Sequence, residues 1–208
     1  NKKKEVLPTG TCLILVTPDS ERTMCTFLGT AGKINENDVS TEALKQSEIV
    51  FLEGYLWDEG DPKKAFDKAI NNSKKVAMSL SDKFCVDRHK SHFLDLVKNK
   101  LDITFSNEEE IISLINANNF NEVIEFAKQI KKLLVITRGD KGAISINGND
   151  VNEIGIEKNL KIVDLTGAGD LFAAGYLHGI INKLSSSDCL KKGTEMSSKI
   201  IQQIGARL

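Results

Sequence analysis

The chain has 208 residues, of which 40% are hydrophobic and 27% charged, the composition of an ordinary globular protein rather than of a disordered or fibrous one. Its formal net charge of −1 lacks the basic excess of a nucleic-acid-binding protein, and no apolar run approaches the length of a membrane span. We therefore expect neither a nucleic acid nor a membrane as a partner.

The first part of the chain is predicted to hold two strands, a short helix and a third strand. Residues 11–17 form an apolar, buried strand, and a Pro-Asp-Ser-Glu turn leads into a second strand over residues 23–28. Asp38 and Ser40 are candidate N-caps of a short helix. Residues 48–53 are a short apolar strand that ends at a glycine.

The middle of the chain alternates helix and strand. A helix is expected over residues 61–72, because a proline is tolerated in a first turn. A strand over residues 75–79 precedes a helix that starts at Asp82 or Asp87, and residues 101–105 are the next strand.

The following segment is predicted to hold two helices and three strands. Helices begin at Asn107 and over residues 120–130, and residues 133–137 form a strand rich in β-branched side chains. Residues 143–146 and 151–154 flank the run Asn-Gly-Asn-Asp, which favours a hairpin because asparagine and glycine accept a positive φ.

The last segment is predicted as a short strand over residues 162–164, a glycine turn, and helices over residues 168–182 and 185–204. Repeated strand–helix units with short connections favour an α/β fold with a doubly wound, mostly parallel sheet and helices on both faces. Such sheets bind ligands at the carboxyl ends of their strands.

The cysteines are far apart and include no Cys-x-x-Cys pair, and the histidines have no zinc-ligand spacing. Free, mostly buried thiols are therefore expected, and these are typical of a reducing, cytoplasmic location.

The glycine turn carries the clearest chemical signal. The N–H groups of Gly167, Ala168 and Gly169 lie at a predicted helix N-terminus, where they can hold an anion because they lack partners within the helix. Asp170, in the first helical turn, is placed to take a proton from a hydroxyl that attacks a phosphoryl group. The alternative is that Asp170 only caps the helix and favours its dipole, and sequence chemistry alone leaves both open.

Other phosphate-binding loops do not fit the sequence. A dinucleotide fingerprint needs a third glycine where Phe172 stands. The nearest approach to a Walker A motif, at residues 29–33, continues into Ile34 rather than into serine or threonine.

The stretch Asp-Leu-Thr-Gly-Ala-Gly-Asp resembles the C-terminal signature of PfkB-type, ribokinase-like carbohydrate and nucleoside kinases, with Leu165 in place of the usual threonine. The resemblance implies that Asp170 is the catalytic base and that residues 167–169 form the anion hole. It implies ATP and Mg²⁺ as cofactors, a small-molecule sugar or nucleoside as acceptor, and a monomer or homodimer. It also implies a monovalent cation such as K⁺ beside Asp164.

Two further motifs support this resemblance. The Asn-x-x-Glu run of Asn107 and Glu110 alone indicates a capped helix start, but in the family such a glutamate is associated with hydrated Mg²⁺. Asn107 is then expected on the nucleotide side. Thr137, Gly139 and Gly142 belong to a Thr-x-Gly-x-x-Gly run that is either a plain turn or, by the resemblance, part of the nucleotide site.

The acceptor side resembles the adenosine-kinase-like branch over residues 9–12 and 22–29, although Cys25 stands where asparagine is common. Tyr55 and Trp57 follow a strand end and are candidates to stack on a flat base, whereas ordinary packing under a helix is the alternative. A nucleoside such as adenosine, or a related ribosyl compound, is the favoured acceptor.

Several alternatives stay open. A hexose or 2-keto-3-deoxygluconate kinase of the same family, a kinase of the hydroxymethyl-pyrimidine type and a non-catalytic nucleotide-binding regulator are each compatible with part of the pattern, although Asp170 argues against the pyrimidine type. We expect residues 1–208 to be the C-terminal major part of one kinase domain, without the family's N-terminal portion. In it, strands over residues 9–30 adjoin the acceptor and a partly represented β lid, and residues 100–208 carry the nucleotide-binding and catalytic part.

Overall fold

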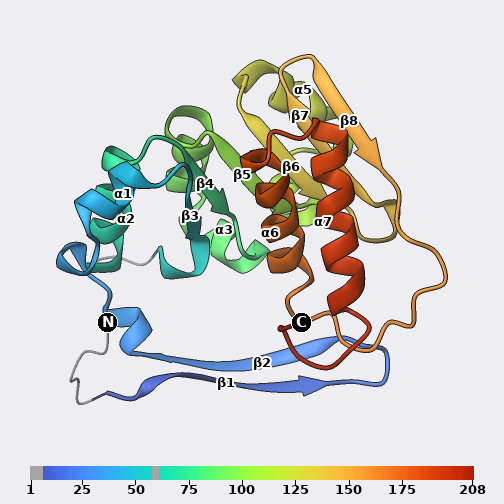
Figure 1. Cartoon of the computed structure of the whole chain (residues 1–208), viewed down its shortest axis with the longest axis horizontal. Helices are drawn as coiled ribbons and strands as arrows, with labels where there is room; N and C mark the ends of the chain where they lie inside the picture. The colour runs from blue at the N-terminus through green and yellow to red at the C-terminus, as the bar shows by residue number, and fades with distance from the viewer. Residues whose placement is uncertain (1–6, 58–60) are drawn as a thin grey trace.

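The computed structural model describes residues 7–57 and 61–208 and contains two separate sheets (Figure 1). A six-stranded sheet in the order β3-β4-β5-β6-β7-β8 forms the centre, and β1 and β2 form a two-stranded antiparallel sheet. The strands are β1 (Thr9–Val16), β2 (Arg22–Gly29), β3 (Val50–Glu53), β4 (Val76–Ser79), β5 (Ile103–Asn107), β6 (Leu133–Thr137), β7 (Ala143–Asn147) and β8 (Asp150–Ile154).

The central sheet is parallel from β3 to β6 and antiparallel from β6 to β8. Its inner strands are buried along most of their length, which explains why they are apolar throughout rather than alternating. The β7–β8 hairpin turns at Gly148, whose φ of 61° is readily adopted by glycine. The predicted mostly parallel α/β sheet is confirmed.

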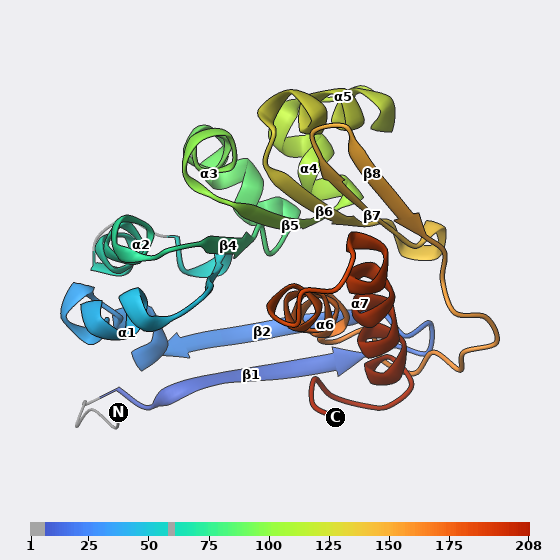
Figure 2. The same ribbon diagram turned by 45° about the horizontal axis from the view of Figure 1, so that its top comes forward.

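The α-helices cover both faces of this sheet, as predicted. They are α1 (Thr41–Gln46), α2 (Asp61–Asn72), α3 (Lys83–Asp95), α4 (Glu108–Ile115), α5 (Phe120–Ile130), α6 (Ala168–Ile181) and α7 (Ser186–Ile200). Short helical turns are η1 (Thr30–Lys33), η2 (Glu36–Asp38), η3 (Gly54–Leu56), η5 (Gly139–Lys141) and the π-type η4 (Leu96–Lys100). Figure 2 shows α2 to α5 on one side of the sheet and α6 and α7 on the other.

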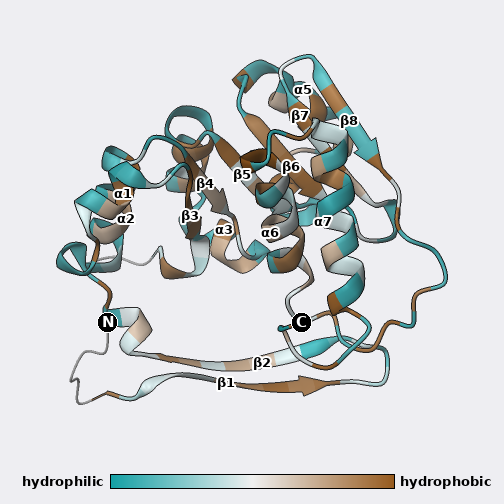
Figure 3. Cartoon of the chain, in the orientation of Figure 1, coloured by the Kyte–Doolittle hydropathy of each residue, from teal (hydrophilic) through white to brown (hydrophobic). Residues whose placement is uncertain are grey.

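Two apolar cores follow from this layering. Alternate residues of β4 point to opposite faces, so Met78 enters the core under α3 to α5 while Ala77 enters the core under α6 and α7. Phe105 packs edge-on against Tyr176 of α6 in the second core, with ring centroids 5.7 Å apart. The apolar colour in Figure 3 accordingly concentrates in the central strands.

The β1–β2 ribbon is held differently from the central sheet. It pairs from Thr9 opposite Gly29 to Val16 opposite Arg22, and its residues are mostly exposed. The strand predicted over residues 11–17 is present as β1, but its predicted burial is wrong, because in the described structure no helix layer covers the ribbon as it covers the sheet. At the tip of the ribbon, the Ser20 hydroxyl donates to the carbonyl of Ile162 at 3.2 Å.

Two predicted element bounds differ from the structure near the C-terminus. Residues 162–164 do not form a strand, because the N–H groups of Val163 and Asp164 donate to the carbonyl of Ile201 at 2.8 and 3.3 Å instead of to a neighbouring strand. The final helix ends at Ile200, earlier than predicted.

The described residues include no helix that is both long and apolar enough to cross a membrane. All four cysteines are thiols outside any disulfide, as predicted, but only Cys85 and Cys189 are buried, while Cys12 and Cys25 lie exposed on the ribbon.

Helices α6 and α7 pack closely because glycines lie at their contact. A Cβ atom added at Gly175 would come within 2.5 Å of the carbonyl oxygen of Lys192, and one at Gly193 within 2.9 Å of the carbonyl oxygen of Phe172. The helices can therefore approach only while these positions lack side chains. Since α6 carries the glycine turn at its N-terminus, this packing also helps to place that turn.

We predict that Gly175→Ala lowers the free energy of unfolding by about 1–3 kcal/mol, because the methyl group forces the helices apart despite its better helix propensity. Gly155→Ala is the matched control, since an added Cβ there meets no atom within 4 Å and its φ is not left-handed. The measurement is denaturant unfolding of both variants. A Gly175→Ala protein as stable as the control would contradict the close-packing interpretation.

Candidate active site

A cavity of about 370 Å³ lies at the carboxyl ends of β3 to β6, between the sheet edge, the N-terminus of α6 and the β1–β2 ribbon. This is the edge at which open α/β sheets bind ligands. Its lining residues are Ile14, Arg22, Met24, Glu53, Tyr55, Ser79, Ser81, Phe105, Ser106, Asn107, Glu110, Val135, Thr137, Thr166, Gly167, Ala168, Gly169, Asp170, Phe172 and Ala206.

The N-terminus of α6 presents backbone donors to this cavity. Gly167 is the N-cap with a φ of 80°, and an added Cβ there would come within 3.0 Å of Ala206, so the position favours glycine on both counts. Ala168 uses its N–H in the turn, donating to Leu165 at 3.2 Å. The N–H groups of Gly167, Gly169 and Asp170 donate to no described residue. Of the three donors predicted to hold an anion, those of Gly167 and Gly169 are thus unpaired among the described residues, together with that of Asp170.

Asp170 is exposed to the cavity and is the third residue of α6. Its carboxylate makes no hydrogen bond or ion pair with any described residue, and α6 has no side-chain cap. The capping alternative thus lacks the hydrogen bond that defines a cap, although a negative charge here still complements the helix dipole.

Asp164 fixes the turn that precedes α6. It is 1% exposed, and one carboxylate oxygen accepts from both the N–H and the hydroxyl of Thr166, at 2.8 and 2.6 Å. The other oxygen accepts from the N–H of Gly205 at 2.9 Å. Burial raises the pKa of Asp164, but these hydrogen bonds and the charge of Arg22 outweigh it and hold the pKa below its ordinary value.

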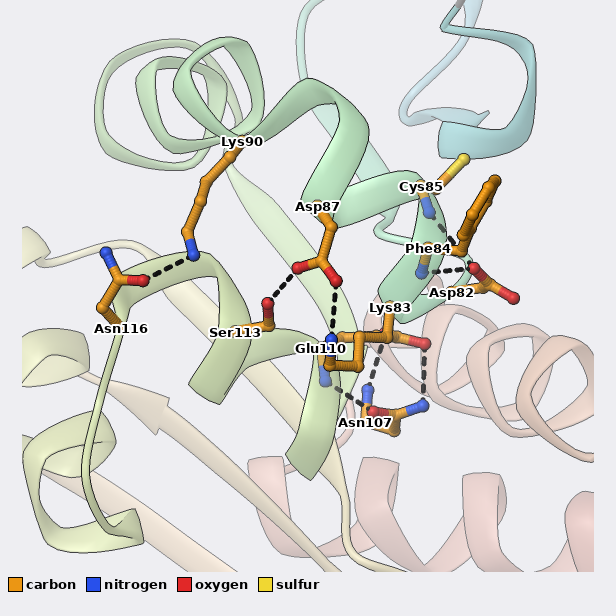
Figure 4. A network of polar contacts seen from close by, with 10 residues as sticks. All are labelled: Asp82, Lys83, Phe84, Cys85, Asp87, Lys90, Asn107, Glu110, Ser113 and Asn116. Atoms are coloured by element: carbon orange, nitrogen blue, oxygen red, sulfur yellow. Dashed lines mark hydrogen bonds and ion pairs between the residues drawn. The ribbon is translucent and has the colours of Figure 1, made fainter.

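Asn107 and Glu110 form a reciprocal capping box at the start of α4 (Figure 4). The Asn107 side chain accepts from the N–H of Glu110 at 2.8 Å, and the Glu110 carboxylate accepts from the N–H and side-chain amide of Asn107 at 2.9 and 2.8 Å. Glu110 is 4% exposed, and burial, with added repulsion from Asp82 and Glu53, raises its pKa to about 7. Asn107 and Glu110 therefore do cap the start of α4, as the alternative interpretation held. Both side chains also line the cavity.

A polar network joins α4 to α3 (Figure 4). Asp87 accepts from Lys83 at 2.6 Å and from the hydroxyl of Ser113, and Lys90 donates to the side chain of Asn116 at 2.6 Å. The two contacts between the helices reach Ser113 and the C-cap Asn116, so they join the C-terminal end of α4 to α3, while the capping box at its start is held by its own hydrogen bonds. In addition, among the described residues no group of three or more His, Cys, Asp or Glu side chains is arranged to hold a metal ion by itself.

The Thr-x-Gly-x-x-Gly run is only partly at the cavity. Thr137 ends β6 and lines it, whereas Gly139 and Gly142 do not. Gly142 has a structural reason to be glycine, since its φ is 87° and a Cβ there would lie 1.9 Å from the carbonyl oxygen of Ile154. Arg138 donates to Glu108 at 2.8 Å and lies 3.7 Å from the ring centroid of Phe120, so its charge is already paired with a carboxylate and an aromatic ring.

The two aromatic candidates, Tyr55 and Trp57, lie in different environments. Tyr55 is 51% exposed and lines the cavity, with its hydroxyl donating to the carbonyl of Ser81 at 3.0 Å. Trp57 is 4% exposed and packs edge-on against Phe66 and Phe93, with ring centroids 5.4 and 6.3 Å away. For Trp57 the candidate role at an acceptor is wrong and the packing alternative is confirmed, because the core under α2 and α3 buries its ring.

Two further cavity residues are Glu53, which has no role in the sequence analysis, and Arg22, which enters it only through the resemblance of residues 22–29. Glu53 ends β3 and accepts from the Ser81 hydroxyl at 3.0 Å, and burial, partly offset by this hydrogen bond and reinforced by the charge of Asp170, raises its pKa to about 7. Arg22 is the only cationic side chain of the described lining. A carboxylate at a parallel-strand end is a signal that could have identified Glu53. Arg22 has no local signal, because the ribbon brings it to the cavity from a distant part of the chain.

Comparison with known proteins identifies the family and the fold. The sequence model described as pfkB family carbohydrate kinase matches residues 2–208. The adenosine kinase of Dictyostelium discoideum is 30% identical over 222 residues, which cover 96% of this chain and 64% of that protein. The ribokinase of Lactococcus lactis is 29% identical over 167 residues, covering 80% of this chain and 51% of that protein.

Among solved structures, adenosine kinase from Sinorhizobium meliloti superposes with a TM-score of 0.93 at 36% identity and covers 97% of this chain and 63% of its own. The chain thus spans somewhat less than two thirds of the length of the adenosine kinases it matches. Because the family match covers nearly every residue, the chain belongs to the pfkB family of carbohydrate kinases and has its ribokinase-like α/β fold.

Proposed function

We propose that the protein transfers the γ-phosphoryl group of ATP, bound with Mg²⁺, to a primary hydroxyl of a sugar or nucleoside. The observation that carries the proposal is Asp170, whose unpaired carboxylate lies in the cavity beside the free N–H groups of Gly167 and Gly169. A carboxylate is a suitable base for a hydroxyl that attacks phosphorus, and free amide groups at a helix N-terminus suit a phosphate.

The remaining groups of the cavity fit the demands of phosphoryl transfer. Such reactions depend on positioning and on neutralising the charge of the phosphoryl oxygens. The amide groups at α6 and the guanidinium of Arg22 supply positive potential without a proton transfer. Asp170 then holds the proton of the acceptor hydroxyl.

The strand order suggests two ends of the cavity. Asn107 and Thr137 end β5 and β6, and Glu110 follows on α4, so we assign this end to the nucleotide and to Mg²⁺, held by Glu110 through water. Gly139 and Gly142 remain proposed nucleotide contacts on the adjoining turn. Glu53 ends β3, two strands away, next to Tyr55.

Glu53 and Tyr55 therefore suit the acceptor, since a carboxylate accepts hydrogen bonds from sugar hydroxyls and a tyrosine ring can lie against a flat base. The K⁺ site beside Asp164 remains a prediction, supported by its buried negative charge and the neighbouring backbone of Thr166 and Gly205.

We further infer that the acceptor is adenosine or a close ribosyl compound. The similarity to the adenosine kinases of Dictyostelium discoideum and Sinorhizobium meliloti supports it, as does the exposed ring of Tyr55. The resemblance to a ribokinase keeps free sugars as the alternative.

Asp170→Asn is expected to lower kcat by roughly 100-fold or more, the scale of a lost general base, while the affinity for ATP stays within a few fold. Asp188→Asn is the matched control, because Asp188 is likewise the third residue of a helix but lies outside the cavity. Steady-state kinetics and ATP titration measure both variants. If both variants show the same small loss of activity, Asp170 is not the catalytic base and only complements the helix dipole. If the unsubstituted protein, with its active site intact, shows no turnover, the result favours a nucleotide-binding regulator.

Glu110→Gln is expected to raise the Mg²⁺ concentration for half-maximal activity, since the neutral amide no longer attracts the hydrated cation. It should also change the pH dependence of stability. Glu110 ordinarily titrates near 4.5 and in the folded protein near 7, so between these values only the folded protein holds the proton and stability falls as pH rises. The variant should lose this fall, on the order of 1–3 kcal/mol.

Glu109→Gln is the control for the Glu110 variant, because Glu109 precedes it on α4 but is exposed and outside the cavity lining. Magnesium titrations of activity and denaturant unfolding at several pH values give the two readouts. A Glu110→Gln magnesium curve that superimposes on that of the control would leave Glu110 with the capping role alone.

For the acceptor, we expect adenosine to give the highest kcat/KM in a competition with ribose, fructose and 2-keto-3-deoxygluconate at equal concentration. The physical reason is that Tyr55 offers a flat apolar surface to a base, which the free sugars lack. Product analysis of the mixture, using the full-length protein, is the measurement. A hexose or keto acid ranking first would overturn the nucleoside assignment and leave the kinase assignment standing.

A further inference from the structure

Ser81 has a backbone conformation that needs an explanation. Its φ is 72°, and the N–H of Asp82 donates to the carbonyl of Leu80 at 2.9 Å across it, which is the hydrogen bond of a three-residue γ-turn. This turn with a positive φ is rare and strained for a residue with a side chain. The other described non-glycine residues with positive φ lie outside the cavity lining, whereas Ser81 is part of it.

The strained turn places the Ser81 hydroxyl between two strand ends. The hydroxyl oxygen accepts from the N–H of Tyr55 at 3.3 Å, so its proton must point elsewhere. The nearer acceptor is the Glu53 carboxylate at 3.0 Å, and the other is the carbonyl of Ser79 at 3.3 Å. A hydrogen bond to a carboxylate is the stronger of the two kinds when the carboxylate is charged.

Neighbouring residues keep this arrangement in place. A Cβ atom at Gly54 would lie 3.1 Å from the Ser81 hydroxyl oxygen and 3.0 Å from the carbonyl oxygens of Ser79 and Leu80, so a side chain after β3 would force the turn to shift by a few tenths of an ångström. The Tyr55 hydroxyl bonds the carbonyl of Ser81 from the other side. The serine is therefore held by contacts on both sides, which is the condition under which strain persists at functional sites.

We propose that Ser81 is a positioning residue for the acceptor: its hydroxyl holds the Glu53 carboxyl in the orientation in which Glu53 meets the acceptor's hydroxyl groups. The inference rests on the proposed function, in which Glu53 lies at the acceptor end of the cavity. The strained turn after β4 thus orients the Glu53 side chain at the end of β3.

The test uses two substitutions of Ser81 in the full-length protein, with adenosine and MgATP as substrates. Ser81→Ala removes the hydroxyl and keeps the strain, whereas Ser81→Gly removes both. Both variants should raise the KM for adenosine by about tenfold, while kcat and the KM for MgATP stay within about twofold. The unfolding midpoint of Ser81→Gly should be no lower than that of Ser81→Ala.

Lys183→Gly is the control for replacing a positive-φ residue by glycine, because Lys183 has a φ of 58° and lies exposed beyond α6, away from the cavity. It should leave the KM for adenosine unchanged. A double-mutant cycle with Glu53→Gln tests the route of the effect. If Ser81 acts through Glu53, Ser81→Gly in the Glu53→Gln background should raise that KM by less than about a further twofold.

Three outcomes would overturn the inference: a KM for adenosine in Ser81→Gly equal to that of the parent, full additivity in the cycle, or an equal rise in the KM for MgATP. In each case turnover by the parent still upholds the proposed function. If the parent transfers no phosphate, the same cycle is measured as dissociation constants for adenosine and ribose by calorimetry. A parent that neither turns over nor binds either compound would overturn the proposed function first, and this inference with it.

Discussion

The buried carboxylate of Asp164 is the interaction on which the geometry of the cavity depends. Removing an ionised carboxylate from water is unfavourable unless hydrogen bonds replace the lost hydration. Here donors from Thr166 and Gly205 provide that replacement, and Gly205 lies 41 positions after Asp164 along the chain. The carboxylate can stay buried only while both segments meet. Its solvation requirement therefore joins the C-terminal segment to the turn that starts α6.

This joint determines where the backbone donors point. The C-terminal segment packs on Gly167 through Ala206, and α7 packs on α6 through positions that lack side chains. The first turn of α6 is consequently held from two directions. An anion site made of backbone N–H groups depends on such rigidity, because its donors have no side-chain freedom with which to follow a ligand.

Much of the fold could be predicted from the sequence because its signals are local. The β7–β8 hairpin follows from Asn147 and Gly148, and the helix starts at Asp82, Asn107 and Ser185 follow from their capping side chains. The sequence left both stacking on an acceptor and packing under a helix open for Trp57, because the residues that bury its ring come from helices that follow it in the chain. The absence of a strand over residues 162–164 could not be predicted from local signals, because their hydrogen-bond acceptor, Ile201, lies almost 40 residues later.

The candidate site shows the same division. The glycine turn, Asp170 and the Asn107–Glu110 pair are recognisable because each motif is contiguous. Arg22 and the Ser81–Glu53 contact are not, since each depends on which strand ends become neighbours. In a parallel sheet the residues at neighbouring strand ends are separated by a whole helix in the sequence. A sequence pattern can therefore supply single members of such a site but not their pairing.

Charge explains why the ribbon belongs to this arrangement although it buries little apolar surface. Glu53, Glu110 and Asp170 bring three carboxyl groups to one cavity, and burial already raises the pKa of Glu53 and Glu110 to about 7. An anionic substrate entering this cavity needs compensating positive charge. In the proposed function Arg22 supplies it from β2, and its charge also lowers the pKa of Asp164. The same guanidinium thus stabilises the ionised form of the carboxylate that fixes α6. A ligand phosphate that draws Arg22 toward the α6 N-terminus would act on both, so the ribbon and the glycine turn are coupled through charge rather than through an apolar core.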